Sequence, residues 1–129
     1  MYTYFKYTKS TKENKIMKIA IIGSRSITDA NLCKYVSRGD EIVSGGAVGI
    51  DTLAAEYAKI NGLKLTVFLP EYEKYGRAAP VVRNKQIVDY ADKIIAFWDG
   101  SSRGTLSVIK YAEKMGKPCE VVTLACSSS

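Results

Sequence analysis

Two glycine-rich segments of this chain combine the residue types that bind phosphate. The first is Ser44-Gly45-Gly46-Ala47-Val48-Gly49-Ile50-Asp51-Thr52, and the second is Gly100-Ser101-Ser102-Arg103-Gly104-Thr105. Each segment follows an apolar run and begins a helical pattern, so backbone N–H groups and a helix N-terminus would meet an anion there. Glycines let the backbone approach a ligand closely, and the serine and threonine hydroxyls add donors. Together the two segments predict a phosphate-binding site.

Charged and amide side chains nearby could complete such a site. Arg25 and Arg83 occupy predicted strand-end and first-turn positions, where a cation would meet an anion, although both could equally be surface charges. Asp51 and Asp99 would repel a phosphate, so if they contact the ligand we expect them to bind a ribose hydroxyl. Asp51 also suits the dipole of its own helix. Asn84 shares a helical face with apolar residues, which favours an amide turned toward the loops.

Three aromatic residues close to these segments could stack on a nucleobase, namely Trp98, Tyr72 and Tyr75. Aromatic side chains near the edge of a sheet more often pack against neighbouring residues. Both interpretations stay open for each of the three.

The absence of histidine excludes several kinds of chemistry. Without imidazole the chain cannot build a Ser-His-Asp triad or a histidine-containing zinc site. Its three cysteines, Cys33, Cys119 and Cys126, have no CxxC spacing. We therefore expect reduced thiols, no metal and no cofactor. Because no run of eighteen apolar residues occurs, we also expect a cytoplasmic protein with no membrane partner.

The net charge of +6 is divided unevenly along the chain. Residues 1–16 hold four lysines and one glutamate, whereas residues 17–129 hold 15 basic and 12 acidic side chains, so each part carries +3. A domain with a charge of +3 suits a phosphorylated small molecule as well as a nucleic-acid strand.

Apolar runs and helical periods alternate from Met17 onward. The apolar runs predict five strands, at 18–22, 41–43, 65–69, 93–97 and 119–124. Helical periodicity predicts four helices, at 29–37, 50–61, 80–90 and 104–115. We expect Thr28 to cap the first helix, Pro80 to begin the third, Gly116 to end the fourth, and residues 70–79 to form a polar loop.

This alternation predicts an α/β fold, a single Rossmann-like domain with helices on both faces of a five-stranded parallel sheet in the order 3-2-1-4-5. The chain reverses between strands 1 and 4, and ligands bind at such a switch point. The loops there are Gly23-Ser24-Arg25-Ser26 and the segment from Trp98 to Thr105, which contains the second glycine-rich segment. Because crossover helices begin at the same edge, the helix starts near Gly49, Pro80 and Gly104 should face one crevice.

The expected domain spans residues 17–124, since the apolar run that follows Met17 reads as a natural start. Residues 125–129 are expected to form a C-terminal tail. Residues 1–16 form a basic N-terminal extension rich in tyrosine and lysine. Three interpretations of the extension stay open: a basic arm without fixed structure, residues left by an upstream start, or an added edge strand.

Four motifs, in order along the chain, resemble the SLOG superfamily. They are Gly23-Ser24-Arg25, the segment from Ser44 to Ala54, the segment from Gly76 to Asn84, and the segment from Ala91 to Thr105. Within the superfamily the chain looks closest to the short, YpsA-related proteins of YspA type. The superfamily also includes the DNA-processing DprA proteins and the Lonely Guy phosphoribohydrolases. The resemblance covers about residues 17–124 and implies a Rossmann-like domain and, since SLOG proteins commonly self-associate, a homo-oligomer.

The resemblance and the motifs together favour a binding protein for a nucleotide or a nucleotide-derived ligand, in a sensor or carrier role. The expected ligand-binding residues follow the glycine loops and the residues beside them. They are Gly23, Ser24, Arg25, Ser44, Gly45, Gly46, Gly49, Asp51, Thr52, Arg83, Asn84, Asp99, Gly100, Ser101, Ser102, Gly104 and Thr105.

The first alternative is an N-glycosidic hydrolase of Lonely Guy type with an altered active site. Those enzymes carry the motif Pro-Gly-Gly-x-Gly-Thr-x-x-Glu, of which this chain retains Gly104-Thr105. Val108 stands at the position of the catalytic glutamate, and Glu113 lies about 140° around the same predicted helix. No catalytic residue is therefore assigned.

The second alternative is single-stranded DNA binding. The segment from Ser44 to Ala54 and the pair Arg83-Asn84 are similar to the corresponding stretches of DprA proteins. Binding to a strand would need a basic groove with stacking aromatic residues. The candidate cations are scattered, as on an ordinary solvated surface.

Overall fold

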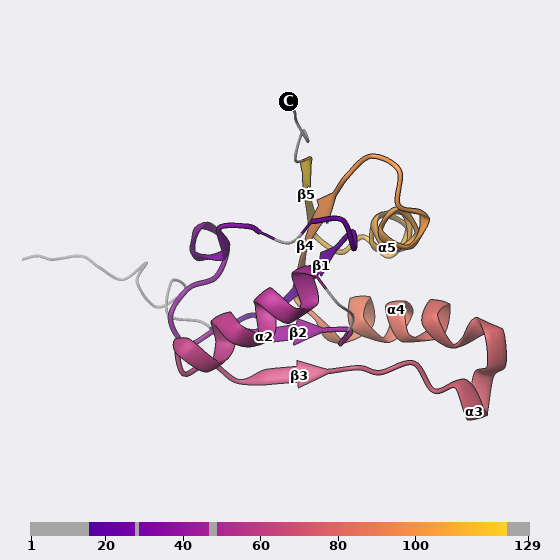
Figure 1. Cartoon of the computed structure of the whole chain (residues 1–129), viewed down its shortest axis with the longest axis horizontal. Helices are drawn as coiled ribbons and strands as arrows, with labels where there is room; N and C mark the ends of the chain where they lie inside the picture. Colours follow the sequence, from indigo (N-terminus) through magenta and orange to yellow (C-terminus); the bar gives the residue numbers. More distant parts are fainter. Residues whose placement is uncertain (1–15, 28, 47–48, 124–129) are drawn as a thin grey trace, which may run out of the picture.

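One parallel sheet with two buried faces organises the fold. The computed structural model describes residues 16–27, 29–46 and 49–123. Within these ranges five strands, all parallel, pair in the order β3-β2-β1-β4-β5. They are β1 (Lys18–Gly23), β2 (Glu41–Ser44), β3 (Leu65–Val67), β4 (Lys93–Trp98) and β5 (Cys119–Thr123). The predicted α/β class, strand order and strand direction are confirmed (Figure 1).

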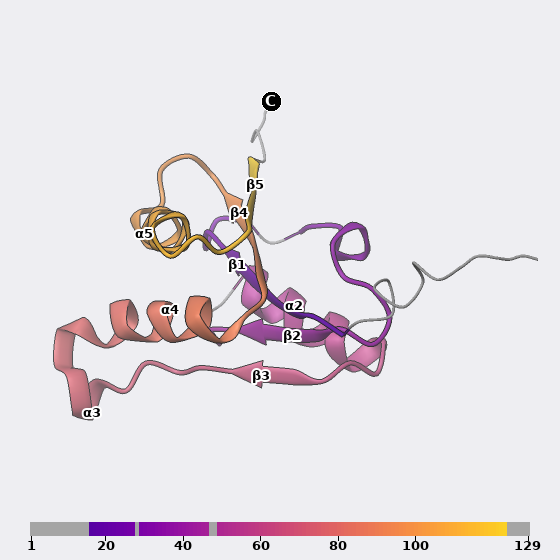
Figure 2. The same ribbon diagram turned by 180° about the vertical axis from the view of Figure 1, so that it is seen from behind.

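Helices cover both faces because alternate residues of the central strands point to opposite sides. The three long helices are α2 (Ile50–Ile60), α4 (Ala79–Tyr90) and α5 (Arg103–Lys114). Ile19 and Ile21 of β1 share a buried cluster with α2, whereas Ala20 and Ile22 share a second cluster with α4 and α5 (Figures 1 and 2). Because all strands are parallel and these helices follow β2, β3 and β4 along the chain, each helix begins at the carboxyl edge of the sheet.

The carboxyl ends of β1 and β4 lie side by side. Gly23 is paired with Phe97, and the N–H of Ser24 donates to the carbonyl oxygen of Phe97 at 2.9 Å. After β1 the chain runs to β2 through a connection whose Leu32 and Val36 pack in the same cluster as α2, whereas after β4 it enters α5 on the other face. This is the switch point that the strand order predicts.

The helix predicted at 29–37 is wrong, since the structure forms only a 3-10 turn there, η1 (Leu32–Lys34). The side-chain oxygen of Asn31 accepts the N–H of Cys33, and Asp40 accepts the N–H of Ser37 at 2.8 Å. Such local acceptors compete with helical hydrogen bonds on both sides of the turn. Thr28, the predicted cap, lies outside the described residues.

The polar loop predicted at 70–79 is also wrong in part, because helical turns occupy it. They are α3 (Tyr72–Tyr75) and η2 (Gly76–Ala78). The N–H of Tyr75 donates to the carbonyl oxygen of Glu71 at 3.0 Å, and Gly76 then turns the chain at a φ of 58°. Figure 1 shows α3 beyond the carboxyl end of β3, where the chain enters α4.

Strand β3 ends earlier than predicted, at Val67 instead of Leu69, although the N–H of Phe68 still donates to the carbonyl oxygen of Ser44 at 2.9 Å. The other strands and the three long helices begin and end within one residue of the predicted bounds. Gly116, at a φ of 69°, follows the end of α5 and is the glycine predicted to end this helix.

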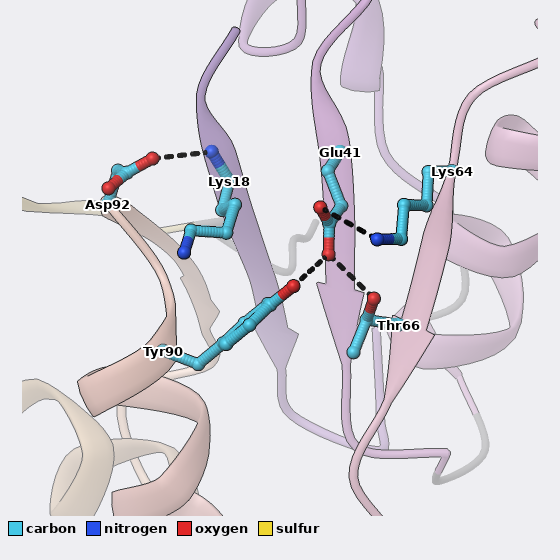
Figure 3. A network of polar contacts seen from close by, with 6 residues as sticks. All are labelled: Lys18, Glu41, Lys64, Thr66, Tyr90 and Asp92. Atoms are coloured by element: carbon cyan, nitrogen blue, oxygen red, sulfur yellow. Dashed lines mark hydrogen bonds and ion pairs between the residues drawn. The ribbon is translucent and has the colours of Figure 1, made fainter.

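A buried carboxylate fixes the opposite, amino edge of the sheet (Figure 3). Oε2 of Glu41 accepts the hydroxyls of Thr66 and Tyr90, each at 2.6 Å, and Lys64 lies 3.8 Å from Oε1. Burial alone would raise the pKa of Glu41, but these hydrogen bonds and the charges of Lys64 and Lys18 lower it below its ordinary value of 4.5. The network ties β2 to β3 and to the last residue of α4.

None of the helices in the described ranges is long and apolar enough to cross a membrane.

Candidate functional site

A cavity of about 550 Å³ lies at the carboxyl edge of the sheet. Its lining comes from the ends of β1 and β2, the first residues of α2, the first half of α4, the start of α5 and the β3–α3 segment. Ten residues that the sequence singles out line it: Gly23, Arg25, Gly45, Gly46, Asp51, Arg83, Asn84, Ser102, Gly104 and Thr105. Segments far apart in the sequence therefore meet around one space.

Arg83 is held in place beside the first glycine loop. Its Nη1 donates to the carbonyl oxygen of Gly45 at 2.6 Å, and its Nε donates to Oδ1 of Asn84 at 2.8 Å. A Cβ on Gly45 would lie 2.9 Å from Arg83 Nη1 and 3.3 Å from Oδ2 of Asp51. Only a glycine leaves the guanidinium this close to the loop. The carbonyl oxygen of Gly45 and the side-chain oxygen of Asn84 therefore fix the orientation of the Arg83 guanidinium group.

The second glycine loop delivers the N-terminus of α5 to the same cavity. Ser102 is the N-cap, and its Oγ accepts the N–H of Thr105 at 3.4 Å. The first intrahelical hydrogen bond runs from the N–H of Leu106 to the carbonyl oxygen of Ser102, so the N–H groups of Arg103 and Gly104 precede it. A Cβ on Gly104 would meet no protein atom within 4 Å. This end of the cavity offers donors and a partial positive charge to an anion.

The other wall of the cavity is apolar, and sequence reasoning largely missed it. Its residues are Ile22, Ile87, Val108, Pro70, Pro80 and Tyr72. The first three belong to the buried cluster under α4 and α5, so their apolar periodicity identifies them as core residues and gives no sign of a cavity. Val108, which stands where Lonely Guy enzymes carry a catalytic glutamate, thus contributes a hydrocarbon surface.

Seven predicted site residues lie outside the cavity lining. They are Ser24, Ser44, Gly49, Thr52, Asp99, Gly100 and Ser101. Ser24 and Ser44 are buried, and Thr52 is on the exposed side of α2. Gly49 has a φ of 82° and packs so closely on the β1 loop that a Cβ would lie 3.2 Å from the carbonyl oxygen of Arg25. These positions build the loops around the cavity.

Asp99 joins the two switch-point loops. Its carboxylate accepts the N–H groups of Ser101 and Ser102 at 2.9 and 2.8 Å and the hydroxyl of Ser26 at 2.7 Å, and its own N–H donates to Oγ of Ser24 at 3.1 Å. The hydrogen bonds from Ser101, Ser26 and Ser102 hold the pKa of Asp99 well below its ordinary value of 3.8. An ionised carboxylate with these partners clasps the loops together.

Of the three aromatic candidates, Tyr72 lines the cavity and Trp98 and Tyr75 do not. Trp98 donates its indole N–H to the carbonyl oxygen of Ser102 at 3.0 Å, and Tyr75 has the ammonium group of Lys74 5.3 Å from its ring centre. Neither residue lines the cavity, whereas Tyr72 does. Among the described residues, no group of three or more acidic or cysteine side chains is arranged to hold a metal ion.

Comparison with known families gives one match, which covers the first part of the chain. A family model described as DNA recombination-mediator protein A matches residues 4–75, more than half of the chain. The chain belongs to this family. The matched region contains β1, β2, α2 and β3 and therefore the loops at Gly23 and Gly45. The predicted relation to SLOG proteins through the DprA branch is confirmed, and the closer likeness to YspA-type proteins stays a prediction.

Comparisons with curated proteins and with solved structures found no match. Membership of the DNA recombination-mediator protein A family supports a role connected with DNA or nucleotides. A more specific function is inferred from the residues that line the cavity.

Proposed function

We propose that this protein binds a nucleotide in the cavity at the carboxyl edge of the sheet. The convergence of two glycine loops and two arginines on one space is the observation that carries the proposal. In this account the phosphate lies against Arg25, Arg83 and the N-terminus of α5, and the ribose lies on the side of Asp51. A volume of about 550 Å³ is in the range of small-molecule sites and suits one nucleotide.

The charge of the lining supports a ligand with few phosphates. Arg25 and Arg83 contribute two positive charges and Asp51 one negative charge, while the N-termini of α2 and α5 add about half a charge each. The same lining has an apolar wall that a bare phosphate would leave uncovered. A ligand that carries both an anionic group and an aromatic base matches both walls.

Thermal unfolding in the presence of individual nucleotides tests the proposal. A ligand at a hundredfold excess over its dissociation constant should stabilise the protein by about 2.7 kcal/mol. Gly104→Ala supplies the decisive variant, because the new methyl group meets no protein atom but stands at the cavity surface. Ser107→Ala, on the exposed side of the same helix, is the matched control.

The proposal predicts that the stabilisation persists in Ser107→Ala and is lost or sharply reduced in Gly104→Ala. A panel of nucleotides that leaves the melting temperature unchanged would refute it. If a nucleotide stabilises both variants equally, the ligand does not bind at the N-terminus of α5.

A second candidate is single-stranded DNA, which family membership favours. In this case one nucleotide unit of the strand would occupy the cavity and further phosphates would contact the surface. The two candidates differ in salt dependence, because the logarithm of the affinity for a strand falls with that of the salt concentration by about 0.7 per phosphate contacted. A slope of about 0.7 indicates contact with one phosphate, as at a mononucleotide site, whereas a slope of about 2 or more with an oligonucleotide supports strand binding.

A further inference from the structure

The strand order gives the cavity two chemically different ends. The segment after β3 supplies Pro70 and Tyr72, and the segment after β4 supplies Ser102 and Gly104. Strands β2 and β1 lie between β3 and β4, so three interstrand spacings, about 14 Å, separate the two segments where they leave the sheet. Helix α4 contacts both α3 and α5 and connects the two ends (Figure 2).

The α5 end carries hydrogen-bond donors, with Val108 one helical turn further along, and the α3 end is apolar. At the α5 end the hydroxyls of Ser102 and Thr105 accompany the helix N-terminus. The lining at the α3 end includes Pro70, Pro80 and Tyr72, and Tyr72 is 60% exposed although it lines the cavity. An exposed tyrosine and two prolines give this end of the lining an apolar surface. Such a surface suits the face of a nucleobase.

We propose that Tyr72 stacks on the nucleobase of the bound ligand and makes the site selective for nucleotides over sugar phosphates. The inference rests on the proposed function and assigns a part of the ligand to each end of the cavity. The phosphate lies at the α5 end, the ribose passes Arg83 and Asp51, and the base lies against Tyr72. Stacking of a base on an aromatic ring tolerates any base, so Tyr72 selects for the presence of a base and not for its identity.

Two other aromatic residues cannot take this place. The indole N–H of Trp98 is engaged with the carbonyl oxygen of Ser102, and Trp98 lies outside the lining. Tyr75 belongs to the same short helix as Tyr72 but is also outside the lining, which makes it a matched control.

The test compares two probes on the full chain, adenosine 5′-monophosphate and ribose 5-phosphate, by calorimetric titration. Tyr72→Ala should weaken binding of the nucleotide by about tenfold and leave that of ribose 5-phosphate unchanged, because only the nucleotide has a base to stack. Tyr72→Phe keeps the ring and should restore nucleotide affinity. Tyr75→Ala should bind both probes like the unchanged protein.

Several results would overturn the inference. Nucleotide affinity that survives Tyr72→Ala, while Gly104→Ala abolishes it, leaves the proposed function intact and removes the stacking role. Equal losses for both probes in Tyr72→Ala would show that the tyrosine only shapes the segment. If the unchanged protein binds no nucleotide, the proposed function and the inference fall together.

Discussion

Three glycines at the carboxyl edge of the sheet have different tasks at the residue scale. A Cβ on Gly23 would collide with the side chain of Ile50, which is fully buried. A Cβ on Gly45 would meet the end of the Arg83 side chain, which can move away. A Cβ on Gly104 would meet open space. The fold itself therefore requires the first glycine, the position of the arginine depends on the second, and only a ligand would sense the third.

Alanine substitutions separate the first two tasks. Gly23→Ala overpacks the core and should lower the free energy of unfolding by about 3 kcal/mol. Gly45→Ala should lower it by only about 1 kcal/mol, the value of the displaced hydrogen bond from Arg83, yet weaken ligand binding. Urea unfolding of the two variants measures the difference. Equal destabilisation would contradict the assignment of Gly45 to the orientation of Arg83.

The pH dependence of stability should contain a contribution from Glu41. Since the pKa of Glu41 is lowered in the folded chain, its carboxylate stabilises the fold above about pH 4.5, and this stabilisation is lost as the pH falls through the folded pKa. Glu41→Gln cannot titrate and should be less stable than the unchanged protein at neutral pH. The gap in unfolding free energy should narrow as the pH falls below 4.5, and a gap that is independent of pH would argue against the network.

At the scale of elements, the clasp between the two switch-point loops is the contact that assembles the site. Asp99→Ala removes the acceptor shared by Ser26, Ser101 and Ser102. We expect faster amide hydrogen exchange at Ser101 and Ser102, and weaker nucleotide binding because the start of α5 loses its support. Exchange that is unchanged in the variant would show that the loops hold their shape without the carboxylate.

Elements with a long apolar period are predicted well from the sequence, and short ones are not. Apolar residues recur at helical spacing in α2, as they do in α4 and α5. The bounds of α2, Ile50–Ile60, agree with the prediction to within one residue. The segment at 29–37 has apolar residues at compatible spacings, but Asn31 and Asp40 capture backbone N–H groups that a helix needs. Helix α3 has four residues, too few for a periodic signal.

For the whole molecule, the polar half of the candidate site could be predicted, whereas in the apolar half of the lining Tyr72 alone was a candidate for ligand contact. Glycines in strand-to-helix loops and an arginine in a first helical turn are typical of an anion-binding site, so Gly45, Gly104 and Arg83 could be predicted as candidates. The strand order brings them to one cavity. Ile22 and Val108 have the periodicity of core residues and are almost fully buried, and only the three-dimensional packing places them behind the wall of a cavity. Self-association stays a prediction from the family resemblance.

The central claim is that one nucleotide binds between the two glycine loops. Calorimetric titration of the full chain with adenosine 5′-monophosphate, alongside Gly104→Ala and Ser107→Ala, tests it most directly. The account predicts one binding event per chain in the unchanged protein and in Ser107→Ala, and at least tenfold weaker binding in Gly104→Ala, equivalent to about 1.4 kcal/mol. Binding of the same affinity in Gly104→Ala, or no heat of binding in the unchanged protein, would contradict it.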